Sequence, residues 1–314
     1  MHNFHGAHKR HRFFEGWYLK HEKDGHILAL IPAYHVDHQG RASASIQIIT
    51  QEDSDVVSFS ADQFSAAKER FFVKIGNNEF SDLGIHINIQ GKRLSVSGRL
   101  NYTPFHPPRY DMMGPFRHIR WMECNHGIVS LSHRLAGSLC INGRMVDFTQ
   151  GLGYIEKDWG RSFPSAYLWT QCGWLGASQS STVMLSVADI PMLGGHFTGC
   201  IGAVWLDGQE YRLATYRGAT VCKCTAREVI VRQGKMQLQA RLIESRPHPL
   251  RAPTNGGMSR IIHESPACKV RYRFWNNGLL ALDRVGNSAG FEAVSLEETK
   301  EKFDKSGSAH GIPQ

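Results

Sequence analysis

In the stretch Gly84-Ile85-His86-Ile87-Asn88-Ile89, apolar and polar side chains alternate at successive positions. The alternation returns in Leu94-Ser95-Val96-Ser97-Gly98-Arg99-Leu100, and Gln90-Gly91-Lys92 supplies turn residues between the two runs. A period of two is typical of a β-strand that has one face in the core and the other in water. The stretch therefore predicts two half-buried strands joined by a tight turn.

Short apolar or alternating runs, separated by turn residues, recur along most of the chain. Asp207-Gly208 between two of them is a strong signal for a two-residue hairpin turn. Only residues 60–70 and the tail after Ser295 look helical, and both segments are short. Such spacing predicts an all-β protein, either a sandwich or a barrel. The other runs lie at residues 27–31, 45–50, 71–75, 183–187, 202–206, 211–216 and 235–242.

A length of 314 residues suggests about two domains. A weak internal echo agrees with this number. An aromatic strand with Trp17 precedes an apolar strand that ends at Pro32, and a second aromatic strand with Trp169 precedes one that ends at Pro191. Two related β units that divide near residue 150 would explain the echo, and coincidence is the alternative. We expect a flexible arm over residues 1–12, domains over 13–150 and 151–295, and a polar tail over 296–314.

Charge and hydropathy exclude several classes of protein. The net charge is +8 and the isoelectric point about 9.2, but no run of five basic residues occurs, so a solvated basic surface is favoured over nucleic-acid binding. The first ten residues lack the apolar segment of a signal peptide, and no stretch approaches the ~20 apolar residues of a membrane span. Histidines at positions 2, 5, 8 and 11 could bind a metal adventitiously, but a frayed polar arm is the preferred interpretation.

The cysteines and short motifs give little support to other chemistries. Seven cysteines, mostly inside apolar segments, favour reduced core residues in a cytoplasmic protein, and no pair of pairs stands at zinc-site spacing. Motifs for Ser-based hydrolysis and for nucleotide binding are absent. Glu123, Cys124 and His126 together invite a metal or thiol-nucleophile interpretation, although such histidines are more often structural.

Acids stand beside aromatic rings in two segments, and a third segment is rich in rings. On a strand, alternate side chains share a face. Burial among rings raises the pKa of a carboxyl group, which can then donate a proton near neutral pH, and each ring stabilises a nearby cation by roughly 0.5–2 kcal/mol. The alternative is that the rings are core residues and the acids pair with Arg161, Lys157 or backbone amides. The groups that share a face are Glu15 with Trp17, Tyr154 with Glu156 and Asp158, and Tyr167 with Trp169 and Gln171.

Four blocks of the sequence resemble the tocopherol cyclase family, in the order found in that family. The similarity extends from about residue 13 to about residue 292. It implies two lipocalin-like antiparallel β-barrel units in tandem, a fold also expected of the more distantly similar carotenoid hydratases. The blocks are residues 13–20 (Phe-Phe-Glu-Gly-Trp-Tyr-Leu-Lys), residues 153–164, residues 169–172 (Trp-Thr-Gln-Cys) and residues 252–260.

The resemblance implies an enzyme that closes a prenylated hydroquinone to a chromanol, without a cofactor or a metal. An acid protonates the alkene nearest the ring, and the phenol oxygen captures the tertiary carbocation. Glu156 is the expected proton donor, with Tyr154 and Asp158 beside it, and Glu15 is the second candidate. His126 is expected to orient an acid or the phenol. The ligand-binding residues implied by the resemblance are Trp17, Tyr18, Trp159, Phe163 and Trp169 in the apolar wall and Gln171 at the polar head group.

Two departures bear on the substrate. Gly173 stands where the family commonly has Asn, and Asp158 where the plant enzymes have Asn. A carrier of an apolar isoprenoid and an isoprenoid hydratase therefore remain as alternatives to the cyclase. The expected partner in each case is an apolar small molecule with a polar aromatic head, with no nucleic acid. The expected location is the cytoplasm, with peripheral membrane contact where such a substrate resides.

Overall fold

The computed structural model describes residues 4–119, 122–176, 180–192, 195–245 and 248–296. In this part of the chain all regular structure is β except for four short 3₁₀ turns, Gly6–His8, Ala61–Gln63, Gly114–His118 and Thr215–Arg217. The prediction of an all-β antiparallel fold is confirmed. The helix predicted over residues 60–70 is wrong, because Phe64–Ala66 forms strand β5 against β6. The tail predicted after Ser295 lies almost wholly outside the described residues.

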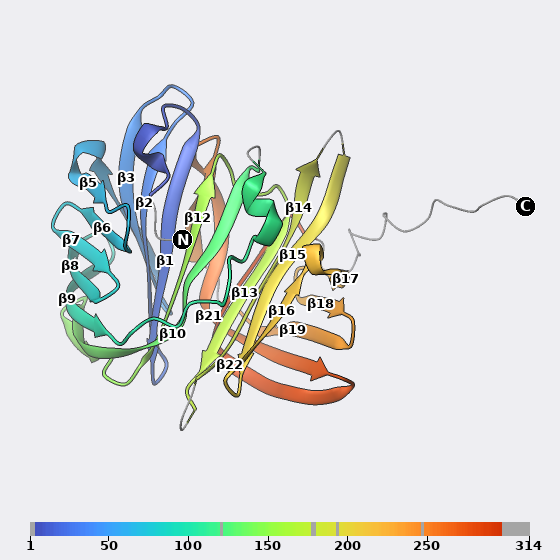
Figure 1. The fold of residues 1–314 in the computed structure, drawn as a ribbon. Coiled ribbons are helices and arrows are strands. Elements are labelled where there is room, and N and C mark those ends of the chain that lie inside the picture. Colours follow the sequence, from blue (N-terminus) through green and yellow to red (C-terminus); the bar gives the residue numbers. More distant parts are fainter. Residues whose placement is uncertain (1–3, 120–121, 177–179, 193–194, 246–247, 297–314) are drawn as a thin grey trace, which may run out of the picture.

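The first sheet has the strand order β4-β3-β2-β1-β12-β10-β9-β8-β7-β6-β5, with β11 paired to β10. It curls into a half-barrel of blue to green strands in Figure 1. Its strands are β1 (Phe13–Lys23), β2 (His26–Val36), β3 (Ala42–Thr50), β4 (Ser54–Ser60), β5 (Phe64–Ala66), β6 (Phe72–Ile75), β7 (Asn78–Ser81), β8 (Gly84–Gln90), β9 (Ser95–Tyr102), β10 (Cys124–Ile141), β11 (Arg144–Asp147) and β12 (Leu152–Gly160).

The second sheet has the order β16-β15-β14-β13-β22-β21-β19-β18-β17, with β20 paired to β21. It lies beside the first sheet in Figure 1, in yellow to red. Its strands are β13 (Tyr167–Trp174), β14 (Ser181–Met192), β15 (Gly195–Leu206), β16 (Gln209–Ala214), β17 (Thr220–Cys224), β18 (Glu228–Gln233), β19 (Met236–Glu244), β20 (His248–Thr254), β21 (Gly257–Asn276) and β22 (Leu279–Val294).

The two hairpins with the clearest sequence signals form as predicted. In β8 and β9, Ile85 pairs with Leu100 and Ile89 with Val96, and their side chains are buried. The turn between β15 and β16 places Asp207 and Gly208 at φ angles of 49° and 78°. Positive φ at both central residues is what a type I′ hairpin requires, and it explains the Asp-Gly pair.

Each sheet encloses an apolar core of its own, and we call a sheet with its core a unit. A third apolar cluster lies between the two sheets. Strand β1 is buried on both faces for this reason. Trp17 and Leu19 point into the first core, whereas Tyr18 belongs to the cluster between the sheets. This third cluster also contains Tyr154 of β12 and Trp169 of β13, so the apolar cluster brings side chains of both units together.

The first sheet includes β12, which pairs with β1 and β10. The chain therefore leaves this sheet after Gly160, ten residues beyond the division expected at residue 150.

The N-terminal segment also has contacts: the His5 amide donates to Glu15 over 2.8 Å, and the Phe4 ring packs against Tyr34 with centroids 5.4 Å apart. Phe4 and His5, within the arm predicted over residues 1–12, thus contact the first sheet.

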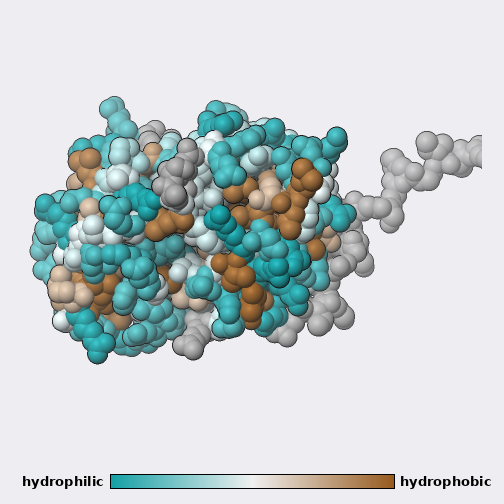
Figure 2. All heavy atoms as spheres, turned by 90° about the horizontal axis from the view of Figure 1, so that it is seen from below, coloured by the Kyte–Doolittle hydropathy of each residue, from teal (hydrophilic) through white to brown (hydrophobic). Residues whose placement is uncertain are grey.

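The face of the molecule drawn in Figure 2 is mainly hydrophilic. Figure 2 shows apolar residues on one face as small patches between hydrophilic ones. No helix among the described residues is long and apolar enough to span a membrane.

Two buried histidines predict an acid-sensitive fold. Burial lowers the pKa of His21 and of His35 from 6.5 to about 4, and at His21 the hydrogen bond from its Nδ1 to the Leu28 carbonyl opposes this effect. The unfolded chain binds protons at these side chains below about pH 6.5, whereas the folded chain does so only near pH 4. Stability is therefore lost as the pH falls through this range, by roughly 3 kcal/mol per histidine. Urea unfolding of wild type and of the His21→Gln/His35→Gln variant from pH 7 to pH 4 should show a flatter profile for the variant; parallel profiles would contradict this assignment.

Candidate active site

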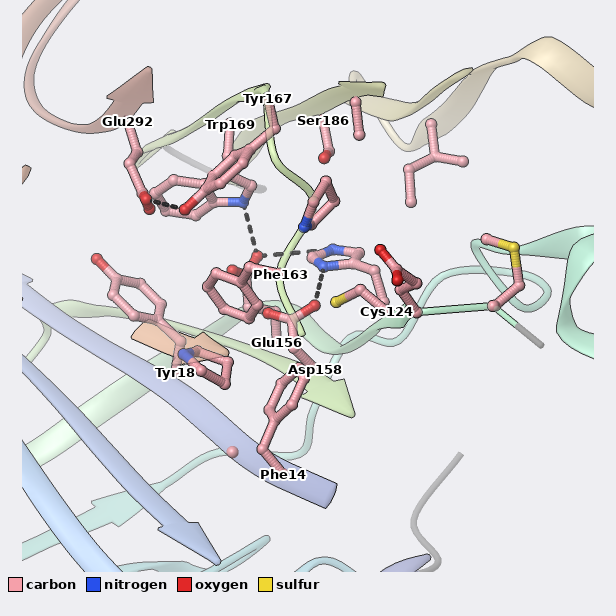
Figure 3. A pocket seen from close by; sticks show the side chains of 18 of the residues that line it. Phe14, Tyr18, Cys124, Glu156, Asp158, Phe163, Tyr167, Trp169, Ser186 and Glu292 are labelled. Atoms are coloured by element: carbon pink, nitrogen blue, oxygen red, sulfur yellow. Dashed lines mark hydrogen bonds and ion pairs between the residues drawn. The ribbon is translucent and has the colours of Figure 1, made fainter. Parts of the chain in front are cut away.

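A partly open pocket lies between the two sheets, and its walls come from both. Figure 3 shows the acids and rings that converge on it. The first sheet contributes Phe14, Tyr18, His126, Glu156 and Asp158. The second sheet and the segment that leads into it contribute Phe163, Tyr167, Trp169, Ser186 and Glu292, among others.

Strand β12 presents its acids to this pocket because side chains alternate along a strand. Tyr154, Glu156 and Asp158 point toward the second sheet, as their shared face predicts, while Ile155 belongs to the first core. The register of β1 and β12 places Tyr18 opposite Glu156, so the two share this face. Tyr154 does not line the pocket itself, but its hydroxyl donates a hydrogen bond to Glu156.

Glu156 is held by donors from both units. Its Oε2 accepts hydrogen bonds from the Tyr154 hydroxyl over 2.6 Å and from the Trp169 indole Nε1 over 3.0 Å. Only 5% of its surface is exposed. Because Oε2 receives both bonds, Oε1 is the oxygen that can carry a proton and present it to a ligand.

His126 of β10 completes an acid cluster. Its Nδ1 lies 2.8 Å from Asp158 Oδ1, and its Nε2 lies 3.8 Å from Glu156 Oε2. Desolvation lowers the pKa of His126, but the charges of Asp158 and Glu156 and the bond to Asp158 outweigh it and raise the pKa to about 9. His126 is therefore a cation at neutral pH, and Asp158 is its hydrogen-bonded counter-ion.

Glu156 retains a proton near neutral pH. Desolvation raises its pKa to about 7, and the charge of Asp158 adds to this effect. The His126 cation and the bonds from Tyr154 and Trp169 act in the opposite direction. Since burial has the larger effect, Glu156 can carry a proton near neutral pH, as a neutral carboxylic acid at the wall of an apolar pocket.

Aromatic rings surround this acid. Tyr18 and Trp169 meet edge to face with centroids 5.4 Å apart, and Phe163 contacts both Phe14 and Tyr167 in similar T-shaped pairs. Ring faces stabilise positive charge through their quadrupoles. The pocket therefore combines a proton donor with an environment that favours a carbocation.

Glu15 lies on the other face of the sheet. It is fully buried in the first unit, where its Oε1 is 2.6 Å from Lys157 Nζ and 3.2 Å from His5 Nδ1. The register pairs Glu15 with Trp159 and Trp17 with Lys157, so these four side chains share the face opposite Glu156. The alternative in which an acid pairs with Lys157 thus holds for Glu15, which lines no part of the pocket.

Two expected wall residues, Trp17 and Trp159, and the expected head-group residue Gln171 also lie elsewhere. Trp17 is in the first core, Trp159 stacks on His5 with centroids 4.5 Å apart, and Gln171 accepts a bond from the buried Lys20 over 3.4 Å. None of the three lines the pocket. Of the expected wall, Tyr18, Phe163 and Trp169 do line it.

Gly173 is a packing position. A side chain there would meet Leu152 Cδ2 at 2.4 Å, and Gly173 does not line the pocket. Its difference from the family's Asn therefore concerns the contact between the units, and the ligand is not affected directly. Asp158, the other departure, lines the pocket and supplies the counter-ion of His126.

Sequence reasoning missed Glu292. This side chain lies on β22 directly opposite Trp169, lines the pocket and accepts a hydrogen bond from the Tyr167 hydroxyl. A signal was present in the sequence, because Glu292 interrupts the apolar run Gly290-Phe291-Glu292-Ala293-Val294. An acid inside such a run has to be paired or functional.

The cluster could also be considered for a metal or a thiol nucleophile. The ligand atoms of His126, Glu156 and Asp158 lie within 4.8 Å of one another. Binding of a dication there would release the protons that His126 and Glu156 carry in its absence. Cys124 lines the pocket, but burial raises the pKa of its thiol well above the usual value, so it is a poor nucleophile.

The fold and pocket define a lipocalin-like β protein with a buried acid between two units. The family model described as tocopherol cyclase-like matches residues 107–293, and the chain belongs to this family. A search of curated proteins found no significant match.

Three solved structures share the fold at low sequence identity. A putative AttH from Nitrosomonas europaea has a TM-score of 0.52 and 11% identity and covers 91% of this chain and 94% of its own. Kievitone hydratase from Nectria haematococca has a TM-score of 0.54 and 9% identity, covering 90% and 88%. The protein CghA has the same TM-score and identity and covers 90% and 89%.

The Glu15–Lys157 pair predicts a large stability effect. Glu15→Gln leaves the Lys157 ammonium buried without its counter-charge and should cost about 3–5 kcal/mol in urea unfolding. The Glu15→Gln/Lys157→Met double variant should recover much of that loss. Glu79→Gln, which breaks the half-exposed pair with Lys74, serves as the control and should cost less than about 1 kcal/mol. A loss at Glu15 no larger than that control would show that the pair is not structural.

Proposed function

We propose that this protein catalyses acid-induced closure of a prenylated hydroquinone, or a related isoprenoid, to a chromanol. The observation that carries the proposal is Glu156, a buried acid with a pKa raised to about 7 at the wall of a ring-lined pocket. Membership of the tocopherol cyclase-like family supports the same chemistry.

In the proposed reaction, Glu156 transfers its proton from Oε1 to the less substituted carbon of the alkene. Positive charge develops on the tertiary carbon, near the rings of Tyr18, Phe163 and Trp169, which stabilise it. The phenol oxygen then forms the C–O bond that closes the ring. Tyr154 and Trp169 stabilise the carboxylate that remains, because both donate to Oε2.

His126 and Asp158 are proposed to tune Glu156. The His126 cation, 3.8 Å from Oε2, favours the carboxylate, while Asp158 offsets that charge. Together they hold the pKa of Glu156 close to neutrality, where a general acid is most effective.

Two other functions use the same pocket. A carrier would bind the isoprenoid without turnover, and a hydratase would trap the same cation with water. The hydratase is the stronger of the two, because kievitone hydratase is among the proteins with this fold and hydration begins with the same proton transfer. A cytoplasmic location with peripheral membrane contact stays a prediction for any of the three.

The reaction can be tested by incubating the purified protein with a prenylated hydroquinone in deuterated water. The expected product is a chromanol with one deuterium at the former alkene carbon, formed equally well with a metal chelator present. Glu156→Gln should lower the rate by about 10²–10⁴-fold, since it cannot donate the proton. Glu22→Gln, the same change at a partly buried acid outside the pocket, is the control and should be active. Binding without turnover would leave a carrier, and an added hydroxyl would indicate a hydratase.

The pH profile of kcat provides a second test. The protonated form of Glu156 is required, so kcat should fall as the pH rises through about 7. His126→Gln removes the cation that lowers this pKa, and the midpoint should then move to higher pH. A midpoint that stays in place or moves down would show that another group controls the rate.

A further inference from the structure

The second unit places an acid and a phenol together on the pocket wall that Glu156 does not occupy. Tyr167 of β13 donates its hydroxyl to Glu292 of β22, and both side chains line the pocket. Their exposed fractions are 5% and 6%. Figure 3 shows this pair next to Trp169, whose indole nitrogen is directed at Glu156.

Trp169 connects the two acids. Its indole nitrogen donates to Glu156, and its backbone pairs with that of Glu292 in the sheet. The ring lies over Gly290, where an added Cβ would come within 2.6 Å of it. The glycine thus allows Trp169 to lie between Glu156 on the first unit and Glu292 on the second.

The proposed cyclisation requires a proton acceptor as well as a donor. Glu156 loses a proton to carbon, and the phenol must lose its own proton when its oxygen bonds to the tertiary carbon. An acceptor for the phenolic proton can come from the second unit, where Glu292, with the Tyr167 hydroxyl bonded to it, lines the same pocket as Glu156.

We propose that Glu292, positioned by Tyr167, binds the phenolic hydroxyl of the substrate and accepts its proton. This inference rests on the proposed cyclase function. The O–H bond of Glu156 breaks as a C–H bond forms, the phenol oxygen forms the C–O bond, and the phenolic proton passes to the Glu292 carboxylate. The substrate is isomerised; after product release Glu292 gives its proton to solvent and Glu156 takes up one proton from solvent.

The remaining acids that line the described pocket lie against basic side chains. Asp158 Oδ1 is 2.8 Å from His126, Asp189 Oδ2 is 3.1 Å from His196, and Glu123 is 3.7 Å from Arg161. Glu292 accepts a hydrogen bond from the Tyr167 hydroxyl and lies directly opposite Trp169 in the sheet. This arrangement suits the recognition of a second hydroxyl, that of the ligand.

The test compares a free prenylated hydroquinone with its methyl ether at the cyclising oxygen, both in deuterated water. The ether cannot cyclise, but protonation by Glu156 and loss of a proton still introduce deuterium at its alkene. Glu292→Gln should lower chromanol formation by about 100-fold and leave deuterium incorporation into the ether within about twofold of wild type. Tyr167→Phe should also lower the ratio of chromanol formation to deuterium incorporation into the ether, less strongly than Glu292→Gln does. Glu22→Gln should leave this ratio unchanged.

Wild-type chromanol formation in Glu292→Gln, or an equal loss of both reactions, would overturn the role of Glu292. Binding measurements keep this question separate from the proposed function. If wild type forms no chromanol, the cyclase proposal fails. Titration of the protein's Trp fluorescence with the free hydroquinone and with its ether then still tests whether Glu292 binds the phenolic hydroxyl. Tighter binding of the free hydroquinone than of the ether in wild type, lost in Glu292→Gln, supports the placement; equal affinities in wild type contradict it.

Discussion

The hydrogen bond from the Trp169 indole to Glu156 joins the two units at the pocket. Glu156 belongs to the first sheet and Trp169 to the second, so neither unit alone can build this site. The apolar cluster between the sheets excludes water from the bond, and that exclusion raises the pKa of Glu156. Packing between the units and the chemistry of the acid are therefore consequences of one interface.

The charges of His126 and Asp158 have opposite effects on the pKa of Glu156. A lone carboxyl in this environment would have a still higher pKa, and an unopposed His126 cation would lower it. The bond between His126 and Asp158 keeps the cation in place and partly cancels its charge. On the opposite face of the same sheet, Glu15 and Lys157 form a buried ion pair, so each neutralises the charge of the other inside the first unit.

The candidate site was partly predictable from strand periodicity. Alternation placed Tyr154, Glu156 and Asp158 on one face and Glu15 with Trp17 on another, and both groupings are present in the structure. Periodicity does not show which face of a buried strand meets which core. Since β1 is buried on both sides, Glu15 could be assigned to the pocket only by resemblance, and the register shows that it faces the first core.

The sequence by itself determined the all-β class, the hairpins at residues 84–100 and around Asp207-Gly208, and the acids worth considering, because these depend on local turn chemistry and a period of two. Only the tertiary structure decided that β12 completes the first sheet, that Glu15 is a structural ion pair, and that Glu292 faces the pocket beside Trp169. These facts depend on contacts between strands distant in the chain. Burial and charge at such contacts arise from the assembled units, and no local pattern encodes them.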